Sequence, residues 1–279
     1  MLKKNTTYSS IYFSGSGFLL SYHYGVVKAL KDNNINFENA YGVSGGVHSA
    51  TCILHMSDLE LGIRQLFDLK YLFNTQPNFY KNYRKFVNIL YQNTNFNDHI
   101  HIGIYDFFKK RKKWINSFES LYEFREFILL SSLIPVLIRF FPYFYKGRLY
   151  IDAMSILTSN YVVAVSPCNL MNGPSALVKL EGNYKRYQHF FCNETLMCEA
   201  FISGYRHTLS QIEEPITCDI KSWFKCTMLK HKNWKKSHNI KTSLVSYGNI
   251  LIFIALLYLL VILIKVLNLN KLIQVNIFI

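Results

Sequence analysis

The chain has 279 residues, half of them hydrophobic, and a formal net charge of +14. This composition excludes a disordered polar chain and allows one sizeable domain with a buried core plus appendages. The positive charge favours anionic partners, either nucleic acid or an acidic membrane. Because the sequence has no helix-turn-helix pattern, zinc-finger spacing or basic-aromatic RNA signature, we expect no nucleic-acid partner.

The first elements surround a glycine loop. Residues 8–14 alternate as a strand does, and apolar residues from Phe18 to Leu30 recur at helical spacing. Between them stands Gly15-Ser16-Gly17, whose backbone N–H groups can approach an anion closely. The anion could be a nucleotide phosphate or the oxyanion of acyl transfer, or the loop could be a plain turn. A P-loop lacks support here, since no Gly-Lys-Ser/Thr follows, and a dinucleotide loop would need a glycine where Leu20 stands.

A second glycine-rich turn follows a short predicted strand that ends near Val43. Residues 42–46 read Gly-Val-Ser-Gly-Gly, a G-x-S-x-G pattern before a predicted helix. Gly42 and Gly46 permit a sharp turn that holds Ser44 in a strained, exposed position, and the helix N-terminus favours an alkoxide or oxyanion. The context of strand, turn and helix is that of a nucleophilic serine.

The middle of the chain predicts helices over 58–95, then a hairpin. Residues 99–105 alternate as a strand, and "KKWINSF" is a return strand, with a basic tip at Lys109–Lys113. We expect this tip to be solvated or to touch lipid headgroups. Ser120 and Glu123 form a capping box for a helix that runs to Ser132, before Pro135.

Two further strands, "RLYIDA" and "YVVAVSP", complete an alternation of strands and helices. The second is apolar and β-branched, as in a buried strand. The chain therefore predicts an α/β sheet with helices on both faces.

The C-terminal part predicts a membrane attachment. Leu244 to Ile264 contains no charged residue and is long enough to cross a bilayer. Most flanking cations precede it, at Lys221, Lys225, Lys230, Lys232, Lys235, Lys236 and Lys241. The positive-inside rule then places the large N-terminal part in the cytosol. The six cysteines show no zinc spacing, and with no secretory signal at the N-terminus we expect reduced thiols.

A nucleophilic serine needs a base, and the histidines do not supply one by pattern. His23, His48, His99 and His101 have no motif around them, and none follows an acid in the order of an α/β-hydrolase triad. We interpret all four as structural. The residues alone leave the base unidentified.

Three blocks together resemble the patatin-like phospholipases, most closely the adiponutrin and adipose-triglyceride-lipase branch. These blocks are "FSGSGFLLSYHYGVVKAL", "GVSGGV" and "SSLIPVLIRFFPYFYKGRLYIDAMS". The resemblance covers roughly residues 8–180. It implies a three-layer α/β/α sandwich, with Ser44 as nucleophile, Asp152 as its base, and oxyanion-hole amides from Gly15, Ser16 and Gly17. One departure matters: the family's Asp-Gly is here Asp152-Ala153, and an alanine could displace the base if the glycine's conformation is needed.

The resemblance implies a serine acyl hydrolase of glycerolipid esters, acting in lipid catabolism without a metal or other cofactor. Alternatives are a catalytically impaired lipid-surface protein and a lipid transacylase using the same dyad. We expect a phospholipase-like domain at 8–180, a basic linker region at 181–243 and a membrane-embedded helix at 244–267. The expected partners are the lipid substrate, an endoplasmic reticulum or lipid-droplet surface facing the cytosol, and protein co-regulators.

Overall fold

The computed structural model describes most of the chain before residue 238. The described residues are 1–54, 59–75, 79–92, 98–132, 143–153, 161–168, 176–185, 188 and 192–237. The predicted membrane segment at 244–267 lies outside them, as does Pro135. Within the described ranges, no helix combines the length and apolarity that crossing a bilayer requires.

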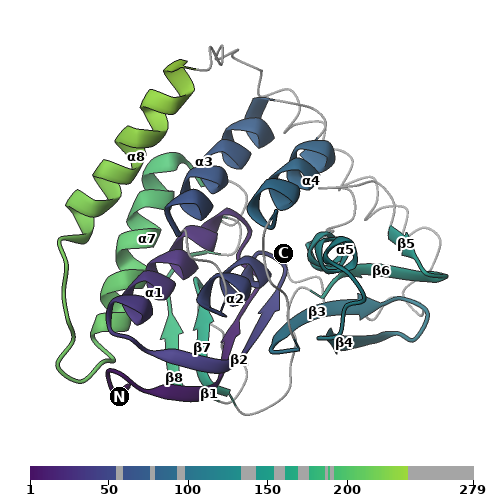
Figure 1. Cartoon of the computed structure of the whole chain (residues 1–279), viewed down its shortest axis with the longest axis horizontal. Helices are drawn as coiled ribbons and strands as arrows, with labels where there is room; N and C mark the ends of the chain where they lie inside the picture. The colour runs from purple at the N-terminus through teal and green to yellow at the C-terminus, as the bar shows by residue number, and fades with distance from the viewer. Residues whose placement is uncertain are drawn as a thin grey trace.

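A mixed sheet forms the centre of the fold (Figure 1). Its strands in the described residues are β1 (Thr7–Phe13), β2 (Asn36–Val43), β3 (Ile100–Asp106), β4 (Arg111–Ile115), β5 (Tyr143–Tyr145), β6 (Arg148–Asp152), β7 (Tyr161–Ser166) and β8 (Ala176–Glu181). They are ordered β5-β6-β3-β2-β1-β7-β8, and β4 pairs with β3. The strands β3, β2, β1, β7 and β8 are parallel, whereas β4, β5 and β6 add antiparallel pairs. The predicted hairpin at 99–118 is confirmed as β3 and β4.

The helices up to α5 lie where the sequence predicts them, whereas α7 and α8 lie in the segment expected to be a linker region. They are α1 (Leu20–Asp32) with a preceding 3-10 turn η1 (Gly17–Leu19), α2 (Gly46–Leu54), α3 (Leu59–Thr75), α4 (Phe79–Leu90), α5 (Leu121–Ser131), α7 (Glu194–Leu209) and α8 (Ile220–Ser237). The capping box of α5 is confirmed: the Glu123 N–H donates to Ser120 Oγ at 3.2 Å, and the Glu119 N–H donates to the Glu123 carboxylate at 2.6 Å. Figure 1 shows α1, α2, α3 and α7 above the central strands.

The alternation of side chains divides the core between the two faces of the sheet. Ile11 and Phe13 belong to a large cluster that includes residues of all the helices named above. Tyr12, which points the other way, belongs to a small cluster. Among the described residues, this small cluster draws only on strands and on Ala153 beside β6, so the helices that can be placed cover one face. The expected second helical layer stays a prediction.

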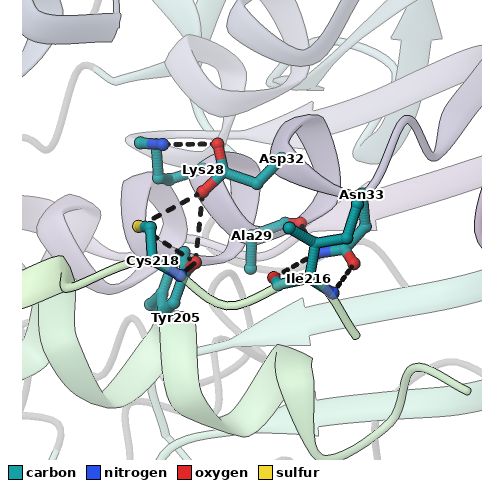
Figure 2. Close-up of polar contacts among 7 residues, drawn as sticks. All are labelled: Lys28, Ala29, Asp32, Asn33, Tyr205, Ile216 and Cys218. Atoms are coloured by element: carbon teal, nitrogen blue, oxygen red, sulfur yellow. Dashed lines mark hydrogen bonds and ion pairs between the residues drawn. The ribbon is translucent and has the colours of Figure 1, made fainter. Parts of the chain in front are cut away.

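The segment at 181–243, expected to be a linker region, contains α7 and α8. Figure 2 shows how the end of α1 is fastened to this part of the chain. The Asn33 side chain donates to the Ile216 carbonyl at 3.2 Å and accepts from the Ile216 N–H at 2.6 Å. Tyr205 of α7 donates to the Asp32 carboxylate at 3.1 Å. These contacts, together with buried Phe201 in the large core cluster, join α7 to the folded domain.

Candidate active site

Ser44 occupies the turn predicted from the G-x-S-x-G pattern. Its φ is +53°, in the left-handed region that non-glycine residues rarely adopt, and it lies directly between β2 and α2. The turn is tight on both sides of the serine. A Cβ added to Gly42 would lie 2.5 Å from Val47 Cα, and one added to Gly46 would lie 2.4 Å from the Phe13 carbonyl oxygen. Both glycines are therefore required by close backbone approach, and they hold Ser44 in a strained position.

The register of β3 brings Asp152 to the end of β2. Gly103 pairs with both Val43 and Trp114, and Ile104 pairs with both Lys113 and Asp152. A strand has two edges, so β4 occupies one and β2 and β6 must share the other. The two strands approach each other from opposite directions and stop at neighbouring positions of β3. Adjacent positions on a strand are about 3.3 Å apart.

This arrangement places the Asp152 backbone beside Val43, the residue that precedes Ser44. The side chains of Ser44 and Asp152 are 7% and 4% exposed, so both belong to a largely dry site. The two residues that the resemblance assigns to the dyad, 108 positions apart in sequence, are brought together by the sheet.

The glycine loop lies against the serine turn. A Cβ added to Gly45 would be 2.6 Å from Ser16 Oγ and 3.2 Å from the backbone nitrogen of Gly17. Gly17 has a φ of +52°, and Gly15 and Gly17 are half-buried whereas Ser16 is buried. The loop predicted from the first motif is therefore next to the turn that holds Ser44.

Ser16 has a further property. Among the described residues its buried hydroxyl has no hydrogen-bond partner. A buried hydroxyl without a partner is costly. The Ser16 hydroxyl is therefore a group of the site that can still form a hydrogen bond.

Helix α5 supplies a residue that the sequence did not indicate. The Ser44 N–H donates to Ser131 Oγ at 2.9 Å, and Ser131 Oγ donates to the Gly103 carbonyl at 2.7 Å. Ser131 is fully buried. It thereby fastens the Ser44 turn to β3, the strand with which β6 and its Asp152 also pair. The only available signal was a serine pair, Ser131-Ser132, at the end of an apolar helix.

Tyr83 of α4 lies close to the same site. Its hydroxyl donates to Ser132 Oγ at 2.7 Å. Burial raises the pKa of Tyr83 and the charge of Asp152 raises it further, against a lowering by the bond to Ser132. Tyr83 is therefore a neutral phenol within electrostatic range of the Asp152 carboxylate. No sequence pattern marked it.

The histidine of α2 confirms the structural interpretation. His48 is buried, and both of its ring nitrogens hydrogen-bond to tyrosines, Tyr91 at 2.6 Å and Tyr83 at 2.9 Å. Burial lowers its pKa to about 3. His48 is neutral at physiological pH and its nitrogens are engaged elsewhere, so it is not placed to deprotonate Ser44.

Ala153 fits the backbone that follows Asp152. It is not among the residues of the described chain with positive φ, so its Cβ meets no left-handed strain. It is buried against the small core cluster of Tyr12, Val43 and Ala164. The concern that a glycine conformation is needed at this position therefore does not apply to this chain.

The electrostatic neighbourhood of Asp152 includes a cation. Burial lowers the pKa of Lys112 in β4, and the Asp152 charge opposes this by raising it. The Asp152 carboxylate therefore has a lysine within electrostatic range.

Comparison with known proteins gives little beyond this geometry. No family model matches the chain, and no curated protein matches it. A solved structure of similar shape is the crystal structure of VipD from Legionella pneumophila, with a TM-score of 0.40 and 9% sequence identity. The match covers 73% of this chain and 66% of VipD, so the chain spans just under two thirds of that protein. A likeness of this degree identifies neither the family nor the activity.

Proposed function

We propose that the chain is a serine–aspartate acyl hydrolase that cleaves glycerolipid esters, with a patatin-like α/β/α architecture. The observation that carries the proposal is the meeting of β2 and β6 on one edge of β3. It brings Asp152 to the end of β2 that precedes the left-handed Ser44, and the Gly15–Gly17 loop lies against the Ser44 turn. Fully buried His48 is engaged by two tyrosines, which favours the carboxylate as the base.

The reaction proceeds in two steps. Asp152 accepts the proton of Ser44 Oγ as that oxygen attacks the ester carbonyl carbon. The amides of Gly15, Ser16 and Gly17 hold the oxyanion of the tetrahedral intermediate, where loss of one donor typically costs roughly 100-fold or more in rate. The intermediate collapses, the alcohol leaves with the proton from Asp152, and an acyl-serine remains. Water, deprotonated by Asp152, then attacks this ester and releases the fatty acid and free Ser44.

The test is labelling of the full chain with a fluorophosphonate, which reacts only with an activated serine. Labelling should occur in wild type and be lost in Ser44→Ala and Asp152→Asn. Release of fatty acid from triacylglycerol and phospholipid emulsions should follow the same pattern and identify the preferred lipid. Fatty-acid release at equal rates in wild type and Ser44→Ala would refute the proposal.

The alternative raised by the Asp152-Ala153 sequence is a lipid-surface protein without catalysis, although the backbone at Ala153 does not favour it. It predicts no fluorophosphonate labelling and an unchanged cellular phenotype in Ser44→Ala. A lipid transacylase would share the acyl-serine but transfer the acyl group to a glyceride hydroxyl. Adding an acceptor such as monoacylglycerol and measuring diacylglycerol against free fatty acid separates transfer from hydrolysis.

The proposed site of action is the cytosolic face of the endoplasmic reticulum or a lipid droplet, with 244–267 embedded in the lipid. A tag placed after Ile279 tests this attachment. Protection of the tag from protease in sealed membranes indicates a spanning segment, and cleavage indicates shallow insertion. We also propose that protein co-regulators bind the chain, and the residues of the site do not identify these proteins.

A further inference from the structure

Two turns lie side by side at the far end of β3. The β3–β4 turn spans residues 107–110, and the β5–β6 turn contains Lys146 and Gly147. Asp106 pairs with Tyr150 of β6, and the next amide, Phe107 N–H, donates to the Leu149 carbonyl at 3.0 Å. The two hairpins therefore project together from the same end of the sheet.

Large apolar residues are exposed on the β3–β4 turn and on β5, next to the β5–β6 turn. Phe107, Phe108 and Phe144 are 48%, 62% and 64% exposed. Phe144 of β5 pairs with Leu149 of β6, and the Leu149 carbonyl accepts from the Phe107 N–H, so β6 separates Phe144 from Phe107 by two strand spacings, about 10 Å. Single exposed apolar residues are ordinary on protein surfaces, whereas a contiguous group of aromatic rings marks an interaction site.

Cations surround these rings, and they differ in how they are paired. Lys113 and Arg148 lie within ion-pair distance of buried Asp106, and Lys146 pairs with Glu119 and Glu123. In the part of the chain that the structure describes, the exposed side chains of Lys109, Lys110 and Arg111 form no ion pair. We call Phe107–Arg111 with Phe144 the tip surface.

The tip surface lies on the active-site side of the sheet. Strand β3 runs parallel to β2 and continues past Val43, and the turn begins at Phe107, four residues after Gly103. Arg148, at the start of β6, is four residues before Asp152, about 13 Å at roughly 3.3 Å per residue. An apolar surface in contact with the tip would therefore lie within one strand length of the candidate dyad.

We propose that the tip surface docks the protein on an anionic lipid bilayer, with the phenylalanine rings entering the interface and the cations facing the headgroups. Aromatic rings partition into this interface, and each nearby Lys or Arg adds attraction to anionic lipid. A single-stranded nucleic acid would also attract rings and cations, but it is bound along a groove, and the tip is the projecting end of two hairpins. The proposal deepens the proposed function, since it rests on that function for the reason why the chain seeks lipid.

The experiment measures protection of the tip from trypsin, because the tip contains cleavable residues and the readout is local even if another segment also holds the protein on the membrane. Full-length Ser44→Ala protein, which leaves lipid intact, is mixed with vesicles of phosphatidylcholine alone or with 30% phosphatidylserine. Cleavage after Lys109, Lys110 and Arg111 is followed by mass spectrometry. Cleavage after Lys70, which is buried in α3, reports unfolding.

Each of the three cations should raise the affinity for anionic vesicles roughly fivefold, so together they predict a preference for anionic over neutral vesicles on the order of 100-fold. Anionic vesicles should therefore slow cleavage of the tip at least about tenfold. Phe107→Ser with Phe108→Ser should abolish the protection. The matched control, Leu177→Ser with Leu229→Ser, removes two other exposed apolar side chains and should retain it.

Several results would overturn the proposal. Equal cleavage with both vesicle types, or full protection in the double phenylalanine variant, contradicts lipid docking at the tip. Protection by a polyuridylate RNA but not by vesicles assigns the surface to nucleic acid, and protection that rises with protein concentration alone assigns it to self-association. Because the protein used is inactive, the result is independent of the fluorophosphonate test. Protection without labelling of the wild type would reject the hydrolase and keep the docking surface.

Discussion

Ser131 gives the sharpest test of how the nucleophile is held. Replacing it with alanine removes a hydroxyl that accepts from the Ser44 N–H at 2.9 Å and donates to the Gly103 carbonyl at 2.7 Å. The site is fully buried, so water does not replace the bonds. An unsatisfied buried group costs about 1–3 kcal/mol, so two such groups predict a loss of about 2–6 kcal/mol of unfolding free energy.

The same change should affect the reactivity of Ser44. A left-handed residue carries strain of order 1–3 kcal/mol that its surroundings must hold, and Ser131 provides one of these restraints. We expect the rate of fluorophosphonate labelling to fall about 10- to 100-fold, the equivalent of about 1.4–2.7 kcal/mol.

The matched control is Ser132→Ala, which removes the acceptor of Tyr83 but leaves the Ser44 amide bonded. Thermal unfolding and labelling rates are measured on both variants at equal temperature. If Ser131→Ala unfolds and reacts as Ser132→Ala does, the Ser44 turn is not held through Ser131 and the reasoning is wrong.

Three further predictions concern the packing of the domain. Gly45→Ala would place a Cβ 2.6 Å from Ser16 Oγ and 3.2 Å from the Gly17 backbone. We therefore expect fluorophosphonate labelling of Ser44 to be lost, while the circular dichroism spectrum of the purified variant matches that of the wild type. Normal labelling of the variant would show that the loop and the turn are not in contact. The pKa of buried His48 is about 3, below its ordinary value of 6.5, so between these pH values the unfolded chain binds more protons and stability falls as the pH drops. We expect urea unfolding to show a loss of about 2 kcal/mol in unfolding free energy from pH 7 to pH 5, and no such loss in His48→Gln. An equal loss in both proteins would exclude His48 as the cause. Asn33→Ala removes both bonds to the Ile216 backbone and should cost about 2 kcal/mol in unfolding free energy, whereas the exposed Asn36→Ala should cost less than about 0.5 kcal/mol; equal costs would contradict the fastening of α1 to the following segment.

The local elements were predictable because their causes are local. The turn at Ser44 follows from the glycines around it, and the start of α5 follows from Ser120 and Glu123. The hairpin of β3 and β4 follows from alternation on both sides of a polar turn. In each case the residues that determine the conformation are within a few positions of one another.

The proposed base and its neighbours were not predictable from the residues alone. The register of β6 on β3 brings Asp152 to the end of β2 that precedes Ser44, and no local pattern encodes that register. Its place in the site was expected only from the family resemblance. No sequence pattern indicates a role for Ser131 or Tyr83, because serine and tyrosine are common on helices and only packing brings these two to the site.

Because β2 and β6 meet end to end on β3, the proposed Ser44–Asp152 pair depends on a more exact strand register than the fold itself requires. If β6 moved two residues along β3, its hydrogen-bond pattern and the facing of its side chains would be preserved, but the carboxylate would travel about 7 Å. A variant could thus keep every strand of the sheet and still lose the proposed activity through a two-residue shift in the register of β6. The ion pair of Arg148 with buried Asp106 is one contact that opposes such a slip. An ion pair at the start of β6 thus helps to fix the position of Asp152 at the end of the same strand.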